Sequence, residues 1–280
     1  MGERPARLGI LVVHNDPVPE TEIRDMAVRG APEAERASVH AARFECPRPQ
    51  DGEYVGSAAR ALADSPDVRR GLDHLGQLGA DNICLCFGSS SFFGGTAFDA
   101  EFVARAREHS GGVPVFTAAV AIAEALRATG VRRPLVVMPP WFTPPTFAAT
   151  EKYLAEGGVE GVRIVQFELG PEWSGVERYN AFDEGARWVV RPDDVRTQVL
   201  AAFGGDVDGV LIPGSGMRAQ GAVAALEREL DVPVITANQA ALWFGLRTSP
   251  VGQGMPTGSG RLFELLPAPR DTAGDGSGRP

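Results

Sequence analysis

The sequence predicts a doubly wound parallel α/β fold, and three observations point to it. Short apolar runs rich in Val, Ile and Leu alternate with helical patterns along the chain. The apolar runs are nearly continuous, which is typical of strands that helices cover on both faces of a sheet. A similar strand-turn-helix order occurs in both halves of the chain, which favours repeated α/β units.

Each expected strand is a short apolar run that ends in small or polar residues, and each expected helix fills the interval before the next run. The strands are expected at Leu8–Val13, Asn82–Phe87, Val113–Thr117, Pro134–Met138, Arg163–Glu168, Gly209–Pro213 and Val232–Thr236. The helices are expected at about 57–77, 96–109, 118–128, 144–157, 192–203, 217–230 and 238–247.

The two halves share a detailed pattern. One strand of each half ends in a turn of small residues, Gly88–Ser91 and Gly214–Gly216, and each turn precedes a helix. Each half then carries a VPVxTA hexad, at Val113–Ala118 and Val232–Ala237. The shared order indicates a duplicated α/β unit. The alternative is that any α/β protein repeats strand, turn and helix.

Charge and hydropathy exclude several classes of protein. The net charge is −9, from 27 basic and 36 acidic residues, whereas a nucleic-acid-binding protein needs a basic face. No apolar run reaches the roughly 18 residues that span a bilayer. The first residues lack the apolar core of a signal peptide. We therefore expect a cytoplasmic protein that binds neither nucleic acid nor membrane.

The cysteines and histidines form no recognisable site. Cys46, Cys84 and Cys86 are an odd number, which argues against a disulfide framework. The 4 histidines are widely spaced and show no pattern of zinc ligands.

The two Gly/Ser turns are candidate anion sites. At a strand's carboxyl end and a helix's start, such a turn offers free N–H groups, hydroxyl donors and the positive end of the helix dipole. Two turns facing one cleft suit a molecule with two anionic groups, or an enediolate forming on one of them. A plain tight turn also favours Gly and Ser, so that interpretation stays open.

Two other loops carry polar residues. The first strand leads into His14, Asn15 and Asp16, where His14 is a candidate general acid or base and all three also suit a simple turn. Gly214–Gly221 looks like a dinucleotide fingerprint, but its third glycine is displaced. Asn238 also lies near where a ribose-binding acidic residue would be needed, so a dinucleotide site is disfavoured.

Several segments, in this order along the chain, resemble the maleate isomerase and arylmalonate decarboxylase branch of the aspartate/glutamate racemase superfamily. The resemblance covers about residues 7–265. The segments are Leu8–Val13 with Glu20 and Glu22, Ser38–Arg43, Gly88–Phe98, Thr236–Trp243 and Gly260–Phe263.

The resemblance implies two pseudosymmetric flavodoxin-like domains with the active site in the cleft between them, and no metal or organic cofactor. The first domain is expected at 1–117 plus 237–266, and the second at 118–236. Residues 267–280 are rich in Pro, Gly, Asp and Ser, so we expect a disordered tail there.

The sequence departs from the family pattern at its reactive positions. The resemblance implies two cysteines in the racemases and isomerases of the superfamily, and in the decarboxylases of this branch only the second, as proton donor. These two positions correspond here to Phe87 and Gly214, so neither mechanism carries over as it stands. A tyrosine position corresponds to Trp141, and Asp16 lies where isomerases carry Asn. A slip of one residue would bring Cys86 to the mouth of the first turn, although a buried free cysteine is the simpler interpretation.

We therefore expect a cofactor-independent enzyme that acts on a small carboxylic or dicarboxylic acid through an enediolate or carbanion. It would be a decarboxylase, dehydratase or isomerase that lacks the cysteine pair. The alternative is a non-catalytic protein of the same fold that binds a small anion. A homo-oligomer is left open. The expected catalytic residues are His14, Asp16, Cys86 and Ser89, and the expected substrate-binding residues are Asn15, Gly88, Ser90, Ser91, Trp141, Gly214, Ser215, Gly216 and Asn238.

Overall fold

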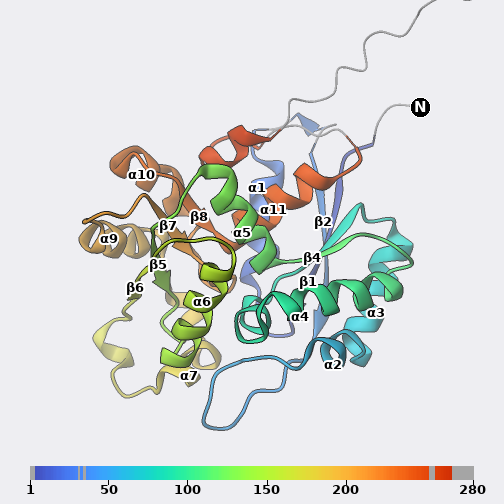
Figure 1. Cartoon of the computed structure of the whole chain (residues 1–280), viewed down its shortest axis with the longest axis horizontal. Coiled ribbons are helices and arrows are strands. Elements are labelled where there is room, and N and C mark those ends of the chain that lie inside the picture. Colours follow the sequence, from blue (N-terminus) through green and yellow to red (C-terminus); the bar gives the residue numbers. More distant parts are fainter. Residues whose placement is uncertain (1–3, 31, 34–35, 252–255, 267–280) are drawn as a thin grey trace, which may run out of the picture.

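The computed structural model describes residues 4–30, 32–33, 36–251 and 256–266. The tail expected at 267–280 lies outside the described residues. Within them the strands form two four-stranded parallel sheets flanked by helices (Figure 1). The predicted fold class is confirmed.

The two sheets have the same internal order. The first sheet has the order β2-β1-β3-β4 and the second has the order β6-β5-β7-β8. This equivalence supports the duplication that the sequence indicates. The strands are β1 (Arg7–Val13), β2 (Ser38–Phe44), β3 (Asn82–Leu85), β4 (Val115–Thr117), β5 (Pro134–Met138), β6 (Arg163–Gln166), β7 (Gly209–Ile212) and β8 (Val234–Thr236).

Helices connect the strands and cover the sheets. The α-helices are α1 (Val18–Val28), α2 (Ala59–Ala63), α3 (Pro66–Leu78), α4 (Gly88–His109), α5 (Ala118–Thr129), α6 (Pro144–Glu156), α7 (Arg178–Ala181), α8 (Arg187–Val189), α9 (Pro192–Ala202), α10 (Gln220–Leu230) and α11 (Ala237–Thr248). Shorter turns are η2 (Pro171–Trp173), η3 (Phe182–Ala186) and η4 (Arg261–Leu265).

The structure differs from the expected elements in several places, three of which lie in the first half of the chain. The unit α1–β2 was not expected, because the SVHAARF segment of β2 is an edge strand with few fully buried side chains. The helix expected at 57–77 is two helices, since Pro66 starts α3 and cannot continue α2. The helix expected from residue 96 begins at Gly88, and its path breaks at Gly95, where φ is 68°.

The two hexads end in equivalent helix caps. Thr117 accepts a hydrogen bond from the Val120 amide at the start of α5. Thr236 accepts one from the Gln239 amide at the start of α11, and the Gln239 side chain accepts one from the Thr236 amide. A threonine at the N-cap satisfies an amide that the helix itself leaves free.

The helices that follow the last strand of each sheet join the halves. In Figure 1, α5 and α11 lie near the centre, between the sheets. Helix α11 follows the second sheet, yet it packs against α5 and against β1 and β3 of the first sheet. One continuous apolar core extends from Ile10 of β1 to Leu211 of β7. The domain boundaries stay a prediction. Among the described residues, no helix is long and apolar enough to cross a membrane.

Candidate active site

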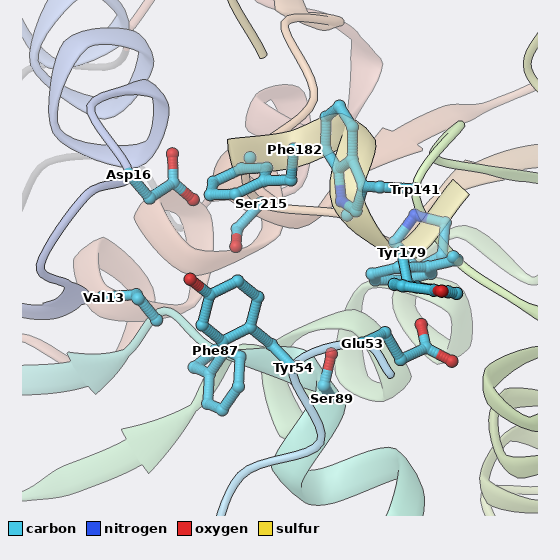
Figure 2. A pocket seen from close by; sticks show the side chains of 15 residues that line it. Val13, Asp16, Glu53, Tyr54, Phe87, Ser89, Trp141, Tyr179, Phe182 and Ser215 are labelled. Atoms are coloured by element: carbon cyan, nitrogen blue, oxygen red, sulfur yellow. The ribbon is translucent and has the colours of Figure 1, made fainter. Parts of the chain in front are cut away.

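A pocket lies between the two halves, where β1, β3, β5 and β7 end (Figure 2). Its position is the usual one for ligands in parallel α/β sheets, outside the carboxyl ends of the strands. It encloses about 50 Å³, which is room for only a few water molecules. The lining residues are Val13, Asp16, Glu53, Tyr54, Phe87, Gly88, Ser89, Trp141, Phe142, Tyr179, Phe182, Pro213, Gly214, Ser215 and Gly216.

The first Gly/Ser turn brings only part of its polar groups to the pocket. Gly88 and Ser89 line it, and the Ser89 hydroxyl has no hydrogen-bond partner among the described residues. These residues open α4, so free amides and the positive end of the helix dipole face the same space. The Ser90 hydroxyl is buried without a partner in this part of the chain.

Ser91 was expected to bind the substrate, but it does not line the pocket. Its hydroxyl is fully buried and donates a hydrogen bond to Asp99 Oδ1 at 2.7 Å. The α4 helix turns this side chain away from the pocket, so its role is structural. Ser90 is likewise absent from the lining.

The second turn, Gly214–Gly216, lies against the first. Gly214 approaches Pro139 so closely that an added Cβ would lie 2.1 Å from Pro139 Cγ. The Ser215 hydroxyl donates a hydrogen bond to the Cys86 carbonyl at 3.3 Å. Within the described chain, the amides of Ser215 and Gly216 have no acceptor. They are therefore available as donors to a ligand.

Together with Glu53, Asp16 is one of two buried acids in the lining of the pocket. Its Oδ1 accepts a hydrogen bond from the Val18 amide at 3.0 Å, and an added Cβ on Gly216 would lie 2.9 Å from its Oδ2. Burial raises the pKa of Asp16 to about 6, although the charges of Arg187 and Arg43 act in the opposite direction. Figure 2 shows its carboxyl group directed toward Phe182 and Ser215. Asp16 can therefore exchange a proton near neutral pH.

The other two residues of this loop do not line the pocket. The His14 side chain is exposed, so the structure does not support it as a general acid or base. Asn15 Nδ2 donates to Asp183 Oδ1 at 2.8 Å and to the Tyr54 hydroxyl at 3.3 Å. The Asn15 amide thus supports the pocket wall instead of facing the pocket.

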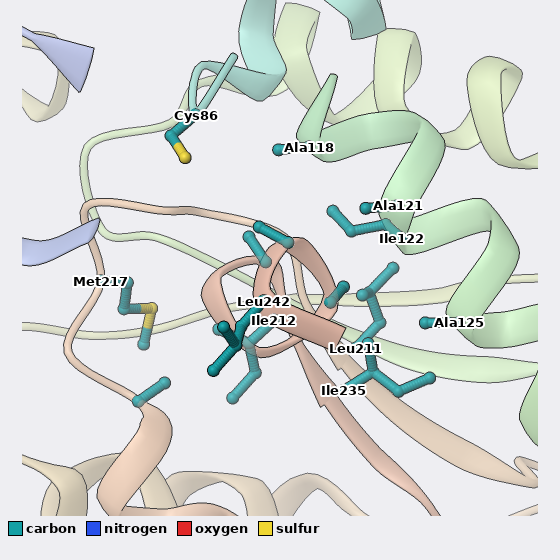
Figure 3. Close-up of a cluster of buried hydrophobic side chains, with 14 of the residues drawn as sticks. Cys86, Ala118, Ala121, Ile122, Ala125, Leu211, Ile212, Met217, Ile235 and Leu242 are labelled. Atoms are coloured by element: carbon teal, nitrogen blue, oxygen red, sulfur yellow. The ribbon is translucent and has the colours of Figure 1, made fainter. Parts of the chain in front are cut away.

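The cysteines lie away from the pocket. Cys86 is 2% exposed and belongs to the apolar core (Figure 3). Its neighbour Phe87 lines the pocket instead (Figure 2). Strand alternation accounts for these opposite directions. Burial raises the pKa of Cys46 to about 11 and that of Cys84 well above its usual value. The structure therefore does not bring the Cys86 thiol to a substrate.

Trp141 lines the pocket as expected, whereas Asn238 supports it from behind. The Trp141 ring makes an edge contact with Phe182, with centroids 5.1 Å apart. Asn238 is buried, and its Nδ2 donates to the Ser215 carbonyl at 2.9 Å and to Glu22 Oε2 at 2.8 Å. Its contacts are thus with the turn and not with the pocket.

Two loops supply lining residues that sequence reasoning missed. Glu53 and Tyr54 lie in the loop after β2, and Tyr179 and Phe182 lie in the long connection after β6. Both loops follow the carboxyl ends of strands, the place where ligands bind. The first was overlooked because β2 was not predicted. Glu53 accepts a hydrogen bond from the Thr143 hydroxyl at 2.6 Å, and burial raises its pKa.

Residues 178–186, here called the cover, close one side of the pocket with Tyr179 and Phe182. Asp183 of the cover accepts hydrogen bonds from the Tyr54 hydroxyl at 3.0 Å and from Asn15, and it forms an ion pair with Arg48 Nε at 3.1 Å. Among the described residues, these are the polar links between the cover and the first half. The Asp183 side chain is 30% exposed, so water competes for these links.

Two parallel α/β halves, with a buried acid and two donor-bearing turns around an enclosed pocket between them, have the form of a small-molecule enzyme. Comparison with known proteins identifies the family. The chain belongs to the arylmalonate decarboxylase family, whose model matches residues 66–263. It is 30% identical to the arylmalonate decarboxylase of Bordetella bronchiseptica over 237 residues, which is 77% of this chain and 93% of that protein.

Solved structures agree with this assignment. Unliganded arylmalonate decarboxylase is 25% identical with a TM-score of 0.69, and the match covers 92% of this chain and 99% of that one. A maleate isomerase variant from Pseudomonas putida, solved with maleate, is 21% identical with a TM-score of 0.74, over 93% and 98% of the two chains.

A maleate cis-trans isomerase variant from Nocardia farcinica carries a covalently bound succinylcysteine intermediate. It is 21% identical with a TM-score of 0.68, over 92% and 98% of the two chains. The two isomerases confirm the fold. The resemblance seen in the sequence is confirmed, and the chain is an enzyme of the lyase and isomerase type.

Proposed function

We propose that this enzyme removes one carboxyl group from a small dicarboxylic acid of the malonate type through an enediolate, without a catalytic thiol. The observation that carries the proposal is the enclosed pocket in which Asp16 and two donor-bearing turns meet with no cysteine in the lining. Aryl-substituted malonic acids are the first substrates to test, because the relative at 30% identity is an arylmalonate decarboxylase. The aromatic walls formed by Tyr54, Phe87, Trp141 and Phe182 suit an aryl group.

We assign binding of the substrate carboxylate to the first turn. The Ser89 hydroxyl and the free amides at the start of α4 are donors for one carboxylate of the substrate. The positive end of the α4 dipole adds to this attraction. Tyr179 and Phe182 of the cover line the same pocket, so we expect the cover to contact the bound acid.

The second turn suits the charge that develops during reaction. When the C–C bond to the leaving carboxylate breaks, CO2 departs and the electron pair moves onto the remaining carboxylate as an enediolate. The amides of Ser215 and Gly216 are placed to donate to the oxygen that gains charge. Fixed donors in a site closed to water stabilise such an oxyanion strongly.

Asp16 is the group we assign to proton transfer. In its acid form it donates a proton to the carbon of the enediolate, and its carboxylate then takes a proton from water. Its pKa of about 6 is close to the pH at which such a group works well. Of His14, Asp16 and Cys86, only Asp16 lines the pocket.

The absence of a thiol at either of the superfamily's two cysteine positions is supported by packing at Gly214. Pro139 occupies the space that a side chain at this position would need. Phe87, at the other cysteine position, fills the pocket wall with a ring. A covalent thiol adduct, as in the isomerase from Nocardia farcinica, is therefore disfavoured here.

We also propose that the reaction needs no metal or organic cofactor. Among the described residues, no three His, Cys, Asp or Glu side chains are grouped as metal ligands. Activity is expected to survive exhaustive dialysis against a chelator. Loss of activity that one added metal restores would contradict this part of the proposal.

The test is turnover of an arylmalonic acid in D2O. The proposal expects CO2 release and a product with one deuterium on the carbon that lost the carboxyl group. Thermal stabilisation by the acid without turnover would instead identify a non-catalytic binding protein.

A further inference from the structure

A carboxylate from the first half clamps the pocket turn of the second half. Glu22 of α1 accepts a hydrogen bond from the Gln220 amide at 2.9 Å, where α10 begins. Its other oxygen accepts one from Asn238 Nδ2 at 2.8 Å, and the same nitrogen donates to the Ser215 carbonyl at 2.9 Å. Glu22 therefore holds both ends of the segment 215–220, one directly and one through Asn238.

The clamped segment carries the donors that the proposed chemistry uses. Ser215 and Gly216 line the pocket, and their amides have no other acceptor in the described chain. Their direction depends on the path of the turn, since a backbone amide cannot rotate independently of it. Glu22 itself does not line the pocket.

The first turn, Gly88–Ser91, is also held by hydrogen bonds to a buried carboxylate, that of Asp99. The hydroxyls of Ser91 and Thr117 donate to Asp99 at 2.7 Å, and the Tyr153 hydroxyl donates to the other Asp99 oxygen at 2.5 Å. Tyr153 belongs to α6, which follows β5 as α1 follows β1. The first helix of each half thus supports the pocket turn of the other half.

We propose that Glu22 is a positioning residue, which sets the Ser215 and Gly216 amides for the enediolate across the boundary between the halves. This inference rests on the proposed function and adds a residue that does not touch the substrate. Burial raises the pKa of Glu22 to about 7, and the hydrogen bonds from Asn238, Gln220 and Ala219 and the charge of Arg218 favour its ionised form. Glu22 is therefore mostly ionised at pH 8.

The Glu22→Gln substitution separates this role from a general effect on stability. A glutamine side chain has one acceptor oxygen and one NH2 group, which is a donor. In the variant, therefore, either the Gln220 amide or Asn238 Nδ2 faces this NH2 group and loses its hydrogen bond. One end of the turn is released. Asp25→Asn is the control, because Asp25 lies on the same helix and is exposed.

The experiment combines hydrogen exchange with kinetics at pH 8. In Glu22→Gln, the amides of Met217 and Gln220, which donate to the Gly214 carbonyl and to Glu22, should exchange at least about tenfold faster, with exchange outside the turn unchanged. The kcat for the arylmalonic acid should fall at least about tenfold while KM changes less than about threefold, because Ser89 and α4 still bind the carboxylate. Asp25→Asn should match the parent in both measurements.

Exchange and kcat like those of the parent in folded Glu22→Gln would overturn the proposal, and so would faster exchange spread over the whole chain. If Glu22→Gln does not fold, Asn238→Ala provides the second test, since it releases only the Ser215 end. It should speed exchange of the Met217 amide, which donates to the Gly214 carbonyl, and leave the Gln220 amide protected by Glu22. Protection of both amides like that in the parent would contradict the proposal. The exchange measurement needs no activity, so it stands even if the parent enzyme turns over no substrate.

Discussion

Asp16 is the residue to which we assign proton transfer in the proposed reaction. Asp16→Asn keeps the size of the side chain but removes the proton that it donates, so kcat should fall about 100-fold or more. Binding of the acid should change little. Asp25→Asn, an exposed site on the neighbouring helix, is the control and should leave kcat unchanged. A folded Asp16→Asn enzyme with the parent's kcat would remove Asp16 from the mechanism.

The pH dependence follows from the same group. The donor must hold its proton, and burial raises the pKa of Asp16 to about 6. The value of kcat/KM should therefore fall as the pH rises through about 6, because the ionised fraction grows. The measurement is a pH–rate profile of the parent enzyme. A rate that only rises through this range would indicate a general base instead of an acid.

Ser89 offers an unpaired hydroxyl to the ligand. Losing one hydrogen bond to a charged group costs about 1.5–3 kcal/mol, so Ser89→Ala should weaken binding of an arylmalonate or dicarboxylate about ten- to a hundredfold. Titration calorimetry measures this effect. The exposed Ser174→Ala is the control. An unchanged Kd for Ser89→Ala would show that the carboxylate binds elsewhere.

At the scale of elements, the cover is held by few polar links. Asp183→Asn removes the ion pair with Arg48 and weakens the hydrogen bonds with Tyr54 and Asn15. Because these links are partly exposed, their loss should free the cover without unfolding the protein. Hydrogen exchange over 178–186 should be faster, and Glu184→Gln should not change it. Exchange like that of the parent in Asp183→Asn would mean that apolar contacts alone hold the cover.

The Thr236 N-cap stabilises α11, one of the two central helices. Thr236→Ala removes the side-chain acceptor for the Gln239 amide, so the free energy of unfolding should fall by about 1 kcal/mol. Thr236→Ser keeps the hydroxyl and should lose much less. Denaturant unfolding compares the two variants. Equal losses would indicate that the methyl group, and not the cap, matters.

Elements differ in how far the sequence predicts them. The buried strands β1, β5 and β7 are continuous apolar runs, so their positions were predicted within a residue or two. The edge strand β2 lacks such a run, and the loop after it, with Glu53 and Tyr54, was missed with it. Edge strands bury less surface, so their sequences are less constrained.

The residues of the candidate site could likewise be predicted only in part from the sequence. Ser89 and Ser215 follow buried strands, and the duplicated pattern placed them at one pocket. The direction of Ser91 and Cys86 could not be predicted, because one residue of helix rotation or strand alternation decides whether a side chain faces the pocket or the core. The cover lies in an irregular connection, where no period in the sequence indicates which side chains turn inward.

At the scale of the whole molecule, two equivalent sheets meet around one pocket, and each half supports the other's turn. Asn238 and Glu22 tie the second turn to the first half, while Tyr153 ties the first turn to the second half. The pocket thus depends on the relative position of both halves. The central claim is that this joint pocket protonates an enediolate without a thiol.

The most direct test compares the parent enzyme with the triple variant Cys46→Ala, Cys84→Ala and Cys86→Ala, each incubated with an arylmalonic acid in D2O. All three cysteines are buried away from the pocket, so the variant loses packing but no reacting group. Proton NMR should show CO2 loss and one deuterium at the α carbon with both proteins, at similar kcat. A folded triple variant that binds the acid but no longer turns it over would contradict the claim.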